Sequence, residues 1–309
     1  MHALQISTAE QGTQEWFKDR SKGVGASDAA AALGLSKWKT PQALWEEKRG
    51  AKTDPSAGWH FERGKALEPI IRQWYANTYQ ASISLPTGIL VHPQHHFMLL
   101  SPDGIVADGT LLEAKVSYDP AAWGEPGTDE VPQEYSLQVQ HALAVTGLER
   151  AAVVVSIMGN IPVVYSVAAD LALQNMIIEG ERQFWQCVQD GTPPAPVTYE
   201  ECVQRYRIAG AASPVEATPE ILAAFGELKI TRAAKKADEE REAELKGIIA
   251  RFLGENEADT LTIDGRVAVT WKERKGSQRV DTQLLKASFP EAAAACTVQG
   301  DSTRTFLVK

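Results

Sequence analysis

Residues 88–116 constrain the fold most, because they form a series of short apolar segments whose lengths are typical of strands. Turn signals (His-Pro, Ser-Pro-Asp and Asp-Gly) separate these segments, which cover 88–91, 96–100, 104–107 and 110–116. A helical period follows in 132–146 and ends at Gly147, and further apolar runs cover 151–159 and 161–167. This order of strands, helix and strands predicts one α/β domain with a mixed sheet.

Helical patterns flank these strands on both sides. The segments before the strands predict helices over 13–20, 40–49 and 62–79, and a further helix that starts at Ser27 as its N-cap. After the strands, residues 170–190 have the same helical character. We therefore expect a central mixed sheet that is flanked by helices.

The chain changes character after Thr-Pro-Pro-Ala-Pro at 192–196, which leads out of this domain. Residues 218–254 predict one long charged helix or a helical hairpin, and 260–274 predict a β-hairpin that turns at Asp264-Gly265. The last six residues, 304–309, have the character of a third strand. The sequence thus predicts one domain over 1–212 and an accessory helical and β-hairpin module over 213–309.

The formal net charge of −9 at first argues against a nucleic-acid partner, because phosphate attracts basic surfaces. The excess acid lies in residues 76–214, which contain 5 Lys and Arg against 15 Asp and Glu. An acidic centre that binds divalent cations can still face a polyanion, because the bound ions change the local field. Net charge therefore does not decide the class of partner.

Cysteine content and hydropathy exclude several other classes of protein. The three cysteines are scattered without CxxC spacing, so we expect neither a disulfide framework nor a structural zinc site. No apolar run approaches the roughly 20 residues that span a bilayer, and the N-terminus lacks the layout of a signal peptide. We expect a cytoplasmic protein without a membrane partner.

Three ionisable residues, Asp103, Glu113 and Lys115, occupy an otherwise small and apolar stretch. Residues i and i+2 of a strand share a face, so Glu113 and Lys115 point together while their neighbours in the strand face the core. A strict two-residue turn at 108–109 would put Asp103 on the other face. We predict a bulge or a three-residue loop over 108–110, which pairs 105 with 113 and 103 with 115.

Two clustered carboxylates are hard oxygen donors of the kind that bind Mg²⁺ or Mn²⁺. A neighbouring lysine then positions or activates a water and stabilises charge on a phosphate. The structural alternative is a surface strand with a Glu–Lys ion pair. The apolar strand around these residues, and the helix with Gln138 that follows it, favour a metal-dependent site.

Four separated blocks together resemble the PD-(D/E)xK nuclease superfamily and, more specifically, the YqaJ-type viral recombinases, the family of phage lambda exonuclease. The resemblance covers about residues 10–190, and four blocks in the right order are much more specific than any one of them. In chain order the blocks are Trp16-Phe17-Lys18-Asp19-Arg20 with Gly25-Ala26-Ser27-Asp28, Gly64-x₃-Glu68-Pro69, Ser101-Pro102-Asp103 with Glu113-x-Lys115, and Tyr135-x₂-Gln138.

The resemblance implies a restriction-endonuclease-like core and a role for each matching residue. The implied metal ligands are Glu68, Asp103, Glu113 and the backbone carbonyl of Ala114. The implied catalytic residues are Asp103, Glu113, Lys115, Tyr135 and Gln138, and the implied contacts to DNA and its 5′-terminal phosphate are Arg20, Ser27 and Ser101.

The residue types alone leave plainer interpretations open for three of these positions. Ser27 serves only as an N-cap, Arg20 pairs with Asp19 or Glu15 at the surface, and Glu68 is a solvated helix acid. Outside the blocks, Trp38 lies between Lys37 and Lys39, and we expect this tryptophan to touch DNA.

The resemblance also implies a function. It implies a 5′-to-3′ exonuclease that uses one or two Mg²⁺ ions (or Mn²⁺) on linear double-stranded DNA and leaves 3′ single-stranded tails for recombination. Implied partners are a single-strand annealing protein and further copies of the chain in a trimeric ring, in a bacterial or phage-infected cell. Two alternatives stay open: another PD-(D/E)xK endonuclease or repair nuclease, and a non-catalytic DNA-binding recombination scaffold.

Overall fold

The computed structural model describes residues 3–50, 58–207, 214–277, 280–298 and 306–308. The chain divides into two compact units, Met1–Tyr206 and Arg207–Lys309. The predicted boundary between residues 212 and 213 lies outside the described residues and stays a prediction. No helix in the described ranges combines the length and the apolar character needed to cross a membrane.

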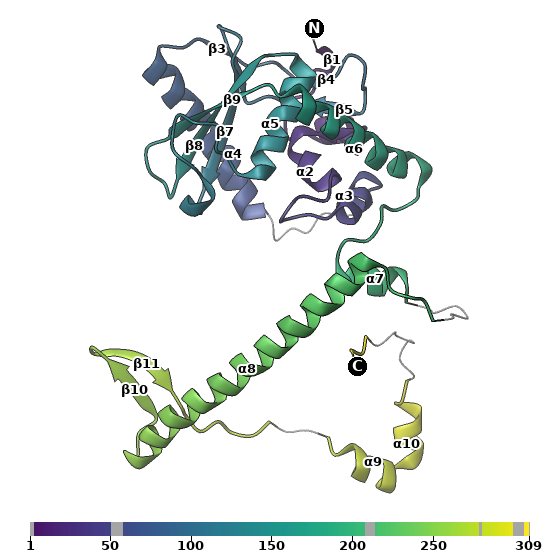
Figure 1. The fold of residues 1–309 in the computed structure, drawn as a ribbon, viewed down its shortest axis with the longest axis vertical. Helices are drawn as coiled ribbons and strands as arrows, with labels where there is room; N and C mark the ends of the chain where they lie inside the picture. Colours follow the sequence, from purple (N-terminus) through teal and green to yellow (C-terminus); the bar gives the residue numbers. More distant parts are fainter. Residues whose placement is uncertain (1–2, 51–57, 208–213, 278–279, 299–305, 309) are drawn as a thin grey trace. The chain divides into compact units, whose positions relative to one another are not determined.

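A five-stranded mixed sheet forms the centre of the first unit (Figure 1). Its strands, in spatial order, are β3 (Ile83–Ser84), β6 (Gly104–Val106), β7 (Leu111–Ser117), β8 (Arg150–Ile157) and β9 (Val163–Ala168). Only β7 and β8 are parallel, and α5 (Gln133–Thr146) makes the crossover between them. The predicted α/β fold with a mixed central sheet is confirmed.

Helices cover both faces of this sheet, which explains why β8 is apolar at nearly every position. On one face, Ile71 of α4 (Gly58–Tyr79) packs with Leu112, Ala152 and Val154. The other face packs against α5 and α6 (Leu171–Asp190) in a larger cluster that includes Leu111. Because alternate residues of β7 face opposite layers, a polar side chain at one face of this strand lies between the sheet and α5.

The first strands of the predicted meander belong to a second sheet, which the sequence pattern did not distinguish from the central one. The spatial order of this second sheet is β1 (Leu4–Ser7), β4 (Ile89–Val91), β5 (Met98–Leu100) and β2 (Val24–Gly25), with β2 and β5 parallel. Between β5 and β6 lies Pro102, which has no backbone N–H to donate and so interrupts the ladder. Asp103 therefore lies at the junction of the two sheets.

The hairpin between β6 and β7 has a three-residue loop, but one residue earlier than predicted. Gly104 pairs with Leu112 and Ile105 with Leu111, so the loop is Ala107–Gly109 rather than 108–110. Gly109 takes a φ of 85°, which suits glycine at the end of such a loop. Extended by one residue, this register brings Asp103 opposite Glu113, not opposite Lys115.

Threonine side chains cap two of the N-terminal helices, whereas the predicted cap at Ser27 does not form. Thr13 caps α1 (Gln14–Arg20) and Thr40 caps α3 (Pro41–Lys48), each by accepting a backbone N–H. Ser27 is not an N-cap: it lies inside a 3₁₀ turn, Ala26–Asp28, that leads into α2 (Ala29–Ala32). Its hydroxyl oxygen accepts instead from the guanidinium of Arg20, a charged and therefore stronger donor than a backbone amide.

The sequence suggested that the chain leaves the first unit at the proline-rich stretch 192–196, but the unit continues to Tyr206. A further helix, α7 (Tyr199–Arg205), follows this stretch and begins with a capping box formed by Thr198 and Glu201. The Thr40 hydroxyl donates to Glu201 at 2.5 Å, which ties α7 to α3. A contact between positions so far apart in the chain has no local sequence signal.

In its described residues, the second unit contains one long helix, a β-hairpin and two short helices. The helix α8 (Pro219–Glu255) is continuous, which decides between the two predicted alternatives. The hairpin of β10 (Thr260–Ile263) and β11 (Arg266–Thr270) turns at Asp264-Gly265, both with positive φ, as predicted. The helices α9 (Thr282–Ser288) and α10 (Pro290–Ala295) follow, and residues 306–308 of the expected third strand belong to no strand. The rest of that expected strand lies outside the described residues.

Candidate active site

A cleft of about 1080 Å³ opens in the first unit, where the junction of the two sheets meets α4 and α5. All four sequence blocks contribute to its lining, although they are spread over more than 100 residues of the chain. The predicted site residues in the lining are Arg20, Ser27, Trp38, Glu68, Ser101, Asp103, Glu113, Ala114, Lys115, Tyr135 and Gln138. The fold thus brings every predicted site residue to one cavity.

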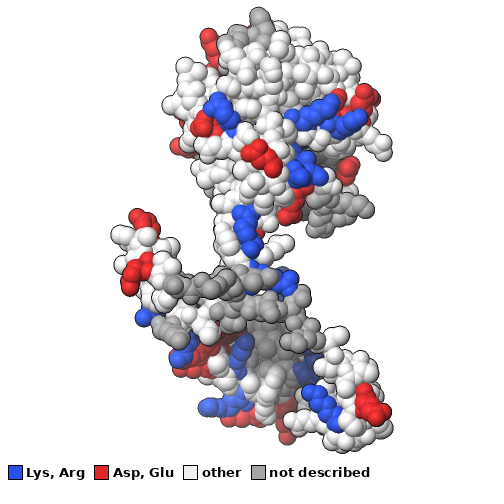
Figure 2. Space-filling model, turned by 90° about the vertical axis from the view of Figure 1, so that its right-hand side faces the viewer, with Lys and Arg blue, Asp and Glu red and all other residues white. Residues whose placement is uncertain are grey.

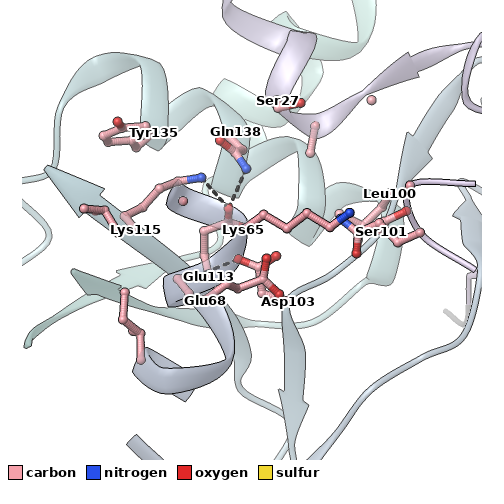
Figure 3. A pocket seen from close by; sticks show the side chains of 18 of the residues that line it. Ser27, Lys65, Glu68, Leu100, Ser101, Asp103, Glu113, Lys115, Tyr135 and Gln138 are labelled. Carbon is pink, nitrogen blue, oxygen red and sulfur yellow. Dashed lines mark hydrogen bonds and ion pairs between the residues drawn. The ribbon is translucent and has the colours of Figure 1, made fainter. Parts of the chain in front are cut away.

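Glu113 is the centre of the hydrogen-bonding network in the cleft. Its Oε1 accepts from Nζ of Lys115 at 2.6 Å and from Nε2 of Gln138 at 2.5 Å. Figure 3 shows the lysine and the glutamine converging on this carboxylate from β7 and α5. Only 6% of the Glu113 side chain is exposed, so both hydrogen bonds form in a weakly screened environment.

Asp103 lies beside Glu113 and is held by the backbone of the same strand. Its Oδ2 accepts the N–H of Ala114 at 2.8 Å, so the carboxylate takes the place of a ladder partner beyond the end of β6. Burial, with the charge of Glu113 as a second cause, raises the pKa of Asp103 well above its usual range. A cation between the two carboxylates would relieve this repulsion.

Lys115 remains a cation in the cleft. Burial lowers its pKa, but the charges of Glu113 and Asp103 and the hydrogen bond to Glu113 outweigh burial, so the net shift of the pKa is upward. The Nζ atom also lies 5.1 Å from the ring centroid of Tyr135, one turn before Gln138 on α5. Tyr135 and Gln138 thus approach Lys115 and Glu113 from one face of α5.

Glu68 lies in the cleft but is engaged by a neighbour on its own helix. Arg72 donates to its Oε1 at 2.9 Å and to the backbone carbonyl of Asp103 at 3.0 Å. Arg72 therefore links α4 to the start of β6. Glu68 is therefore a partly buried member of an ion pair and not a freely solvated helix acid.

The carboxylates of the cleft fit a hard divalent cation only in part. In the described ranges, no group of three or more His, Cys, Asp or Glu side chains is arranged to hold a metal ion. Asp103 and Glu113 form a close pair whose mutual repulsion favours a cation, and oxygen is the donor that Mg²⁺ and Mn²⁺ prefer. Glu68 would complete the set only after it leaves Arg72.

A second group of residues lines the cleft from α1 and the 3₁₀ turn. Nη2 of Arg20 donates to the Ser27 hydroxyl at 2.7 Å and lies 3.3 Å from Oδ2 of Asp28. The guanidinium also lies over the ring of Trp16, whose Nε1 donates to the Ser101 hydroxyl at 3.2 Å. Arg20 therefore pairs neither with Asp19 nor with Glu15, and it faces the cleft.

Asp28 anchors this group from below the surface. Burial raises the pKa of this carboxyl, but the charges of Arg20, Lys48 and Lys39 outweigh burial, so its pKa lies well below the usual value. Lys48 is buried with it, and the Nζ to Oδ2 distance is 2.9 Å. The sequence block contained Asp28, but its neutralisation by α3 had no sequence signal.

Aromatic rings form the wall of the cleft above Lys115. The ring centroids of Trp38 and Tyr135 are 6.1 Å apart, and Trp123 stacks on Tyr135 with a centroid distance of 5.5 Å. Trp38 is 69% exposed, whereas Trp123 is buried. An exposed ring that rests on a fixed aromatic column is suited to stacking against a planar ligand group.

Two basic residues of the cleft were missed by the sequence interpretation. Lys65 and Arg63 both come from α4 and line the cavity. Lys65 precedes Glu68 by three residues, so helical spacing puts both on one face, and this spacing was a usable signal. Figure 3 shows its extended side chain crossing the cleft toward Ser101.

Comparison with known proteins identifies relatives of this chain. The family described as the YqaJ-like viral recombinase domain matches residues 15–149, a segment that contains every predicted site residue. YqaJ of Bacillus subtilis strain 168 is 31% identical over an alignment of 304 residues, which covers 92% of this chain and 90% of that protein. Protein R354 of Acanthamoeba polyphaga mimivirus is 27% identical over 157 residues, which cover 47% of this chain and 28% of that protein.

Solved structures also resemble the chain. An alkaline exonuclease from Laribacter hongkongensis has 24% identity and a TM-score of 0.48, and the match covers 58% of this chain and 94% of that one. A phage-related exonuclease from Haemophilus somnus 129PT has 13% identity and a TM-score of 0.40, over 55% of this chain and 96% of that one.

Proposed function

The chain belongs to the YqaJ-like viral recombinase family, and on this premise we propose that it is a Mg²⁺-dependent exonuclease on linear double-stranded DNA. The observation that carries the proposal is the single cleft in which Asp103, Glu113 and Lys115 lie together with Arg20 and Ser27. The first group has the chemistry of phosphodiester hydrolysis. The second has the chemistry of a phosphate clamp.

In this proposal Asp103 and Glu113 hold the cation, with the backbone carbonyl of Ala114 and with Glu68 once it leaves Arg72. When bound, Mg²⁺ (or Mn²⁺), as one or two ions, acts as a Lewis acid on the scissile phosphate. The raised pKa of Asp103 means that a proton competes with the cation for this carboxylate, so cation affinity increases with pH.

Lys115 acts as a fixed positive charge and not as a proton acceptor. Because its pKa is raised, it is protonated at neutral and mildly alkaline pH, and it can only donate hydrogen bonds. It orients the attacking water and stabilises negative charge that develops on the phosphate. Gln138 and Tyr135 keep Glu113 and the ammonium group in place.

Arg20 and Ser27 give the enzyme its 5′-to-3′ polarity in this proposal. They bind the phosphate of the 5′ end, so the next phosphodiester is presented to the carboxylates. Ser101 accepts a hydrogen bond from Trp16, on which Arg20 rests, and it is close in sequence to Asp103. In this proposal it contributes a further DNA contact. Trp38 stacks on a base at the end of the duplex.

The remaining parts of the proposal concern product and partners. Digestion of one strand leaves a 3′ single-stranded tail, which a single-strand annealing protein pairs with a complementary strand. The chain works as a homo-oligomer, in the trimeric ring that the family resemblance implies. These steps follow from the family premise and not from any feature of the cleft.

A nuclease assay on end-labelled linear duplexes tests the proposal. Substrates with a 5′-phosphate, a 5′-hydroxyl or a blocked 5′ end are compared with and without Mg²⁺. We expect degradation that requires Mg²⁺ and is fastest with the 5′-phosphate. A label at the 5′ end of a strand should be released before a label at its 3′ end. The preference for 5′-phosphate should disappear in Arg20→Ala, whereas Lys18→Ala on the exposed side of the same helix keeps it.

A covalently closed circular duplex separates this function from its rivals. If the circle is cut as fast as linear DNA, the protein is an endonuclease and the exonuclease proposal fails. If no substrate is cut with either Mg²⁺ or Mn²⁺ while DNA is still bound, the protein is a non-catalytic scaffold.

A further inference from the structure

The long helix α8 presents large apolar side chains that the described part of the chain leaves exposed. Among its residues, all of which are described, only Leu253 is buried. Other large apolar residues of the helix are exposed by 41–72%, namely Ile221, Leu222, Phe225, Ile230, Leu245, Ile248 and Phe252. Exposed apolar residues on a helix with so little core of its own indicate a surface for another helix.

Two rows of seven-residue spacing run along one face of α8. They include three of these exposed residues, Ile221, Leu245 and Phe252, and two partly exposed ones, Leu228 and Ile249, whereas Leu222, Phe225, Ile230 and Ile248 lie outside them. The first row is Ile221, Leu228, Lys235, Glu242 and Ile249, and the second, three residues later, is Ala224, Thr231, Asp238, Leu245 and Phe252. Such rows are the a and d positions of a coiled coil. Both are apolar at the two ends of the helix and mostly charged in the middle, so apolar contact is available only at the ends.

An antiparallel pair of α8 helices satisfies both rows at once. In antiparallel pairing an a residue faces a d residue of the other helix, which aligns Ile221 with Phe252 and Leu228 with Leu245. The same register puts Lys235 opposite Asp238 of the second helix. The two-fold axis between the helices repeats each contact, so Asp238 also lies opposite Lys235 of the second helix. Apolar residues near the helix ends thus meet apolar residues, and the central ammonium group meets a carboxylate, whereas Glu242 faces the polar Thr231.

A parallel pair of α8 helices, in contrast, is penalised in its centre. In-register parallel helices face each a residue with its own copy, so two Lys235, two Asp238 and two Glu242 would lie together. Like charges in direct apposition cost several kcal/mol at an interface, whereas opposite charges set orientation and register. The charge pattern therefore selects the antiparallel arrangement.

We propose that α8 is a homodimerisation helix that pairs antiparallel with α8 of a second copy of this chain. The apolar ends supply the affinity, because exposed ion pairs contribute little free energy of their own. The central charges supply the direction. This inference does not rest on the nuclease proposal, and it holds for the full chain whether or not the first unit forms a trimer.

Charge reversal with sedimentation analysis of the full chain tests this proposal. Lys235→Glu and Asp238→Lys each put like charges opposite each other at two symmetric points. We expect each single variant to weaken self-association by at least about tenfold, so that the sedimenting mass falls to half of the wild-type value. The double variant restores opposite charges and should restore the wild-type mass, which shows that loss in the single variants is not unfolding.

The matched control is Lys236→Glu, which makes the same charge change one residue outside the two rows and should leave the mass unchanged. A wild-type mass of a single chain at micromolar concentration would overturn the proposal. So would single reversals that leave the mass unaltered, or a double variant that stays at half mass. The last outcome would mean that these positions face a different surface.

Discussion

At Lys115 two opposing influences act on one ammonium group. Burial favours the neutral amine, whereas Glu113 and Asp103 favour the cation, and the two carboxylates prevail. The sequence predicted that these three charges would share one face. The hydrogen bond from Lys115 to Glu113 and the β6–β7 register, which brings Asp103 opposite Glu113, agree with this prediction, although the roles of these residues in a reaction stay predictions.

Replacement of this lysine tests its role as a fixed charge. We expect Lys115→Ala to lower the rate constant of DNA cleavage by about 100-fold or more, because positioned charges and donors at a reaction centre contribute effects of this size. Single-turnover cleavage at saturating enzyme measures the rate constant. The control Lys22→Ala removes an exposed lysine that pairs with Asp19, and it should cleave like the wild type. Full activity of Lys115→Ala would contradict the mechanism.

Asp28 predicts a pH dependence of stability. Its pKa in the folded protein lies below the usual 3.8, so the folded state favours the carboxylate. Protonation of Asp28 therefore favours unfolding. This stabilisation is complete above about pH 4–5 and is lost as the pH falls through and below 3.8. The wild type should therefore lose free energy of unfolding between pH 6 and pH 3.

The variant Asp28→Asn lacks the titrating group. It should be less stable at pH 6, by about 3 kcal/mol, because it leaves buried Lys48 without its partner. It should also lose less stability than the wild type between pH 6 and pH 3 in urea titrations. The exposed Asp190→Asn serves as control, and an equal slope in wild type and Asp28→Asn would refute this account.

At the scale of elements, the β6–β7 hairpin determines whether the two carboxylates meet. The sequence predicted a three-residue loop because only that parity puts Asp103 on the face of Glu113. The loop does have three residues, as predicted, so Asp103 and Glu113 share a face. The loop begins and ends one residue earlier than predicted, since Gly109 rather than Thr110 ends it. Local turn chemistry thus decided a relation between two residues that lie 10 positions apart.

Substitution of Gly109 tests the turn. We expect Gly109→Ala to lower the free energy of unfolding by about 1 kcal/mol, because a φ of 85° is strained for any residue with a Cβ atom. A Cβ atom at this position has open space, so the loss would come from the backbone alone. Urea denaturation measures it.

The control for this prediction is Gly64→Ala in α4. There, too, a Cβ atom meets open space, but the backbone is helical, so alanine should stabilise by up to about 1 kcal/mol. Opposite signs for two Gly→Ala changes in the same unit would separate backbone strain from packing. A stabilising effect at Gly109 would be inconsistent with the turn.

At the scale of the whole molecule, the net charge says little about the surface that a partner meets. On the face drawn in Figure 2, acidic and basic groups are interspersed. Many acids of residues 76–214 are paired within the fold, for example Glu113 with Lys115, Asp108 with Arg150 and buried Glu181 with His141. The net charge of −9 is therefore compatible with a DNA partner at the cleft.

Metal binding should be visible in the stability of the whole chain. If Asp103 and Glu113 hold the cation, Mg²⁺ at about 100 times its dissociation constant stabilises the folded state by about 2.7 kcal/mol. We expect Mg²⁺ to raise the melting temperature of the wild type and chelation to reverse the rise. Asp103→Asn and Glu113→Gln should lose the response, whereas exposed Asp129→Asn keeps it. An undiminished response in both cleft variants would place the cation elsewhere.

The sequence by itself determined most elements of this protein and the order of its site residues. Periodicity predicted the helices and Gly147 marked the end of one of them, and i to i+2 spacing put Glu113 and Lys115 on one face, because these signals act between near neighbours.

Only the tertiary structure decided how distant segments meet. It split the meander into two sheets, paired Arg20 with Ser27 and with Asp28, and engaged Glu68 with an arginine that also holds the chain at Asp103. It also gave Asp28 its buried lysine from α3. Such contacts depend on competition among many charged and apolar groups for the same positions, and no local pattern records the outcome of that competition.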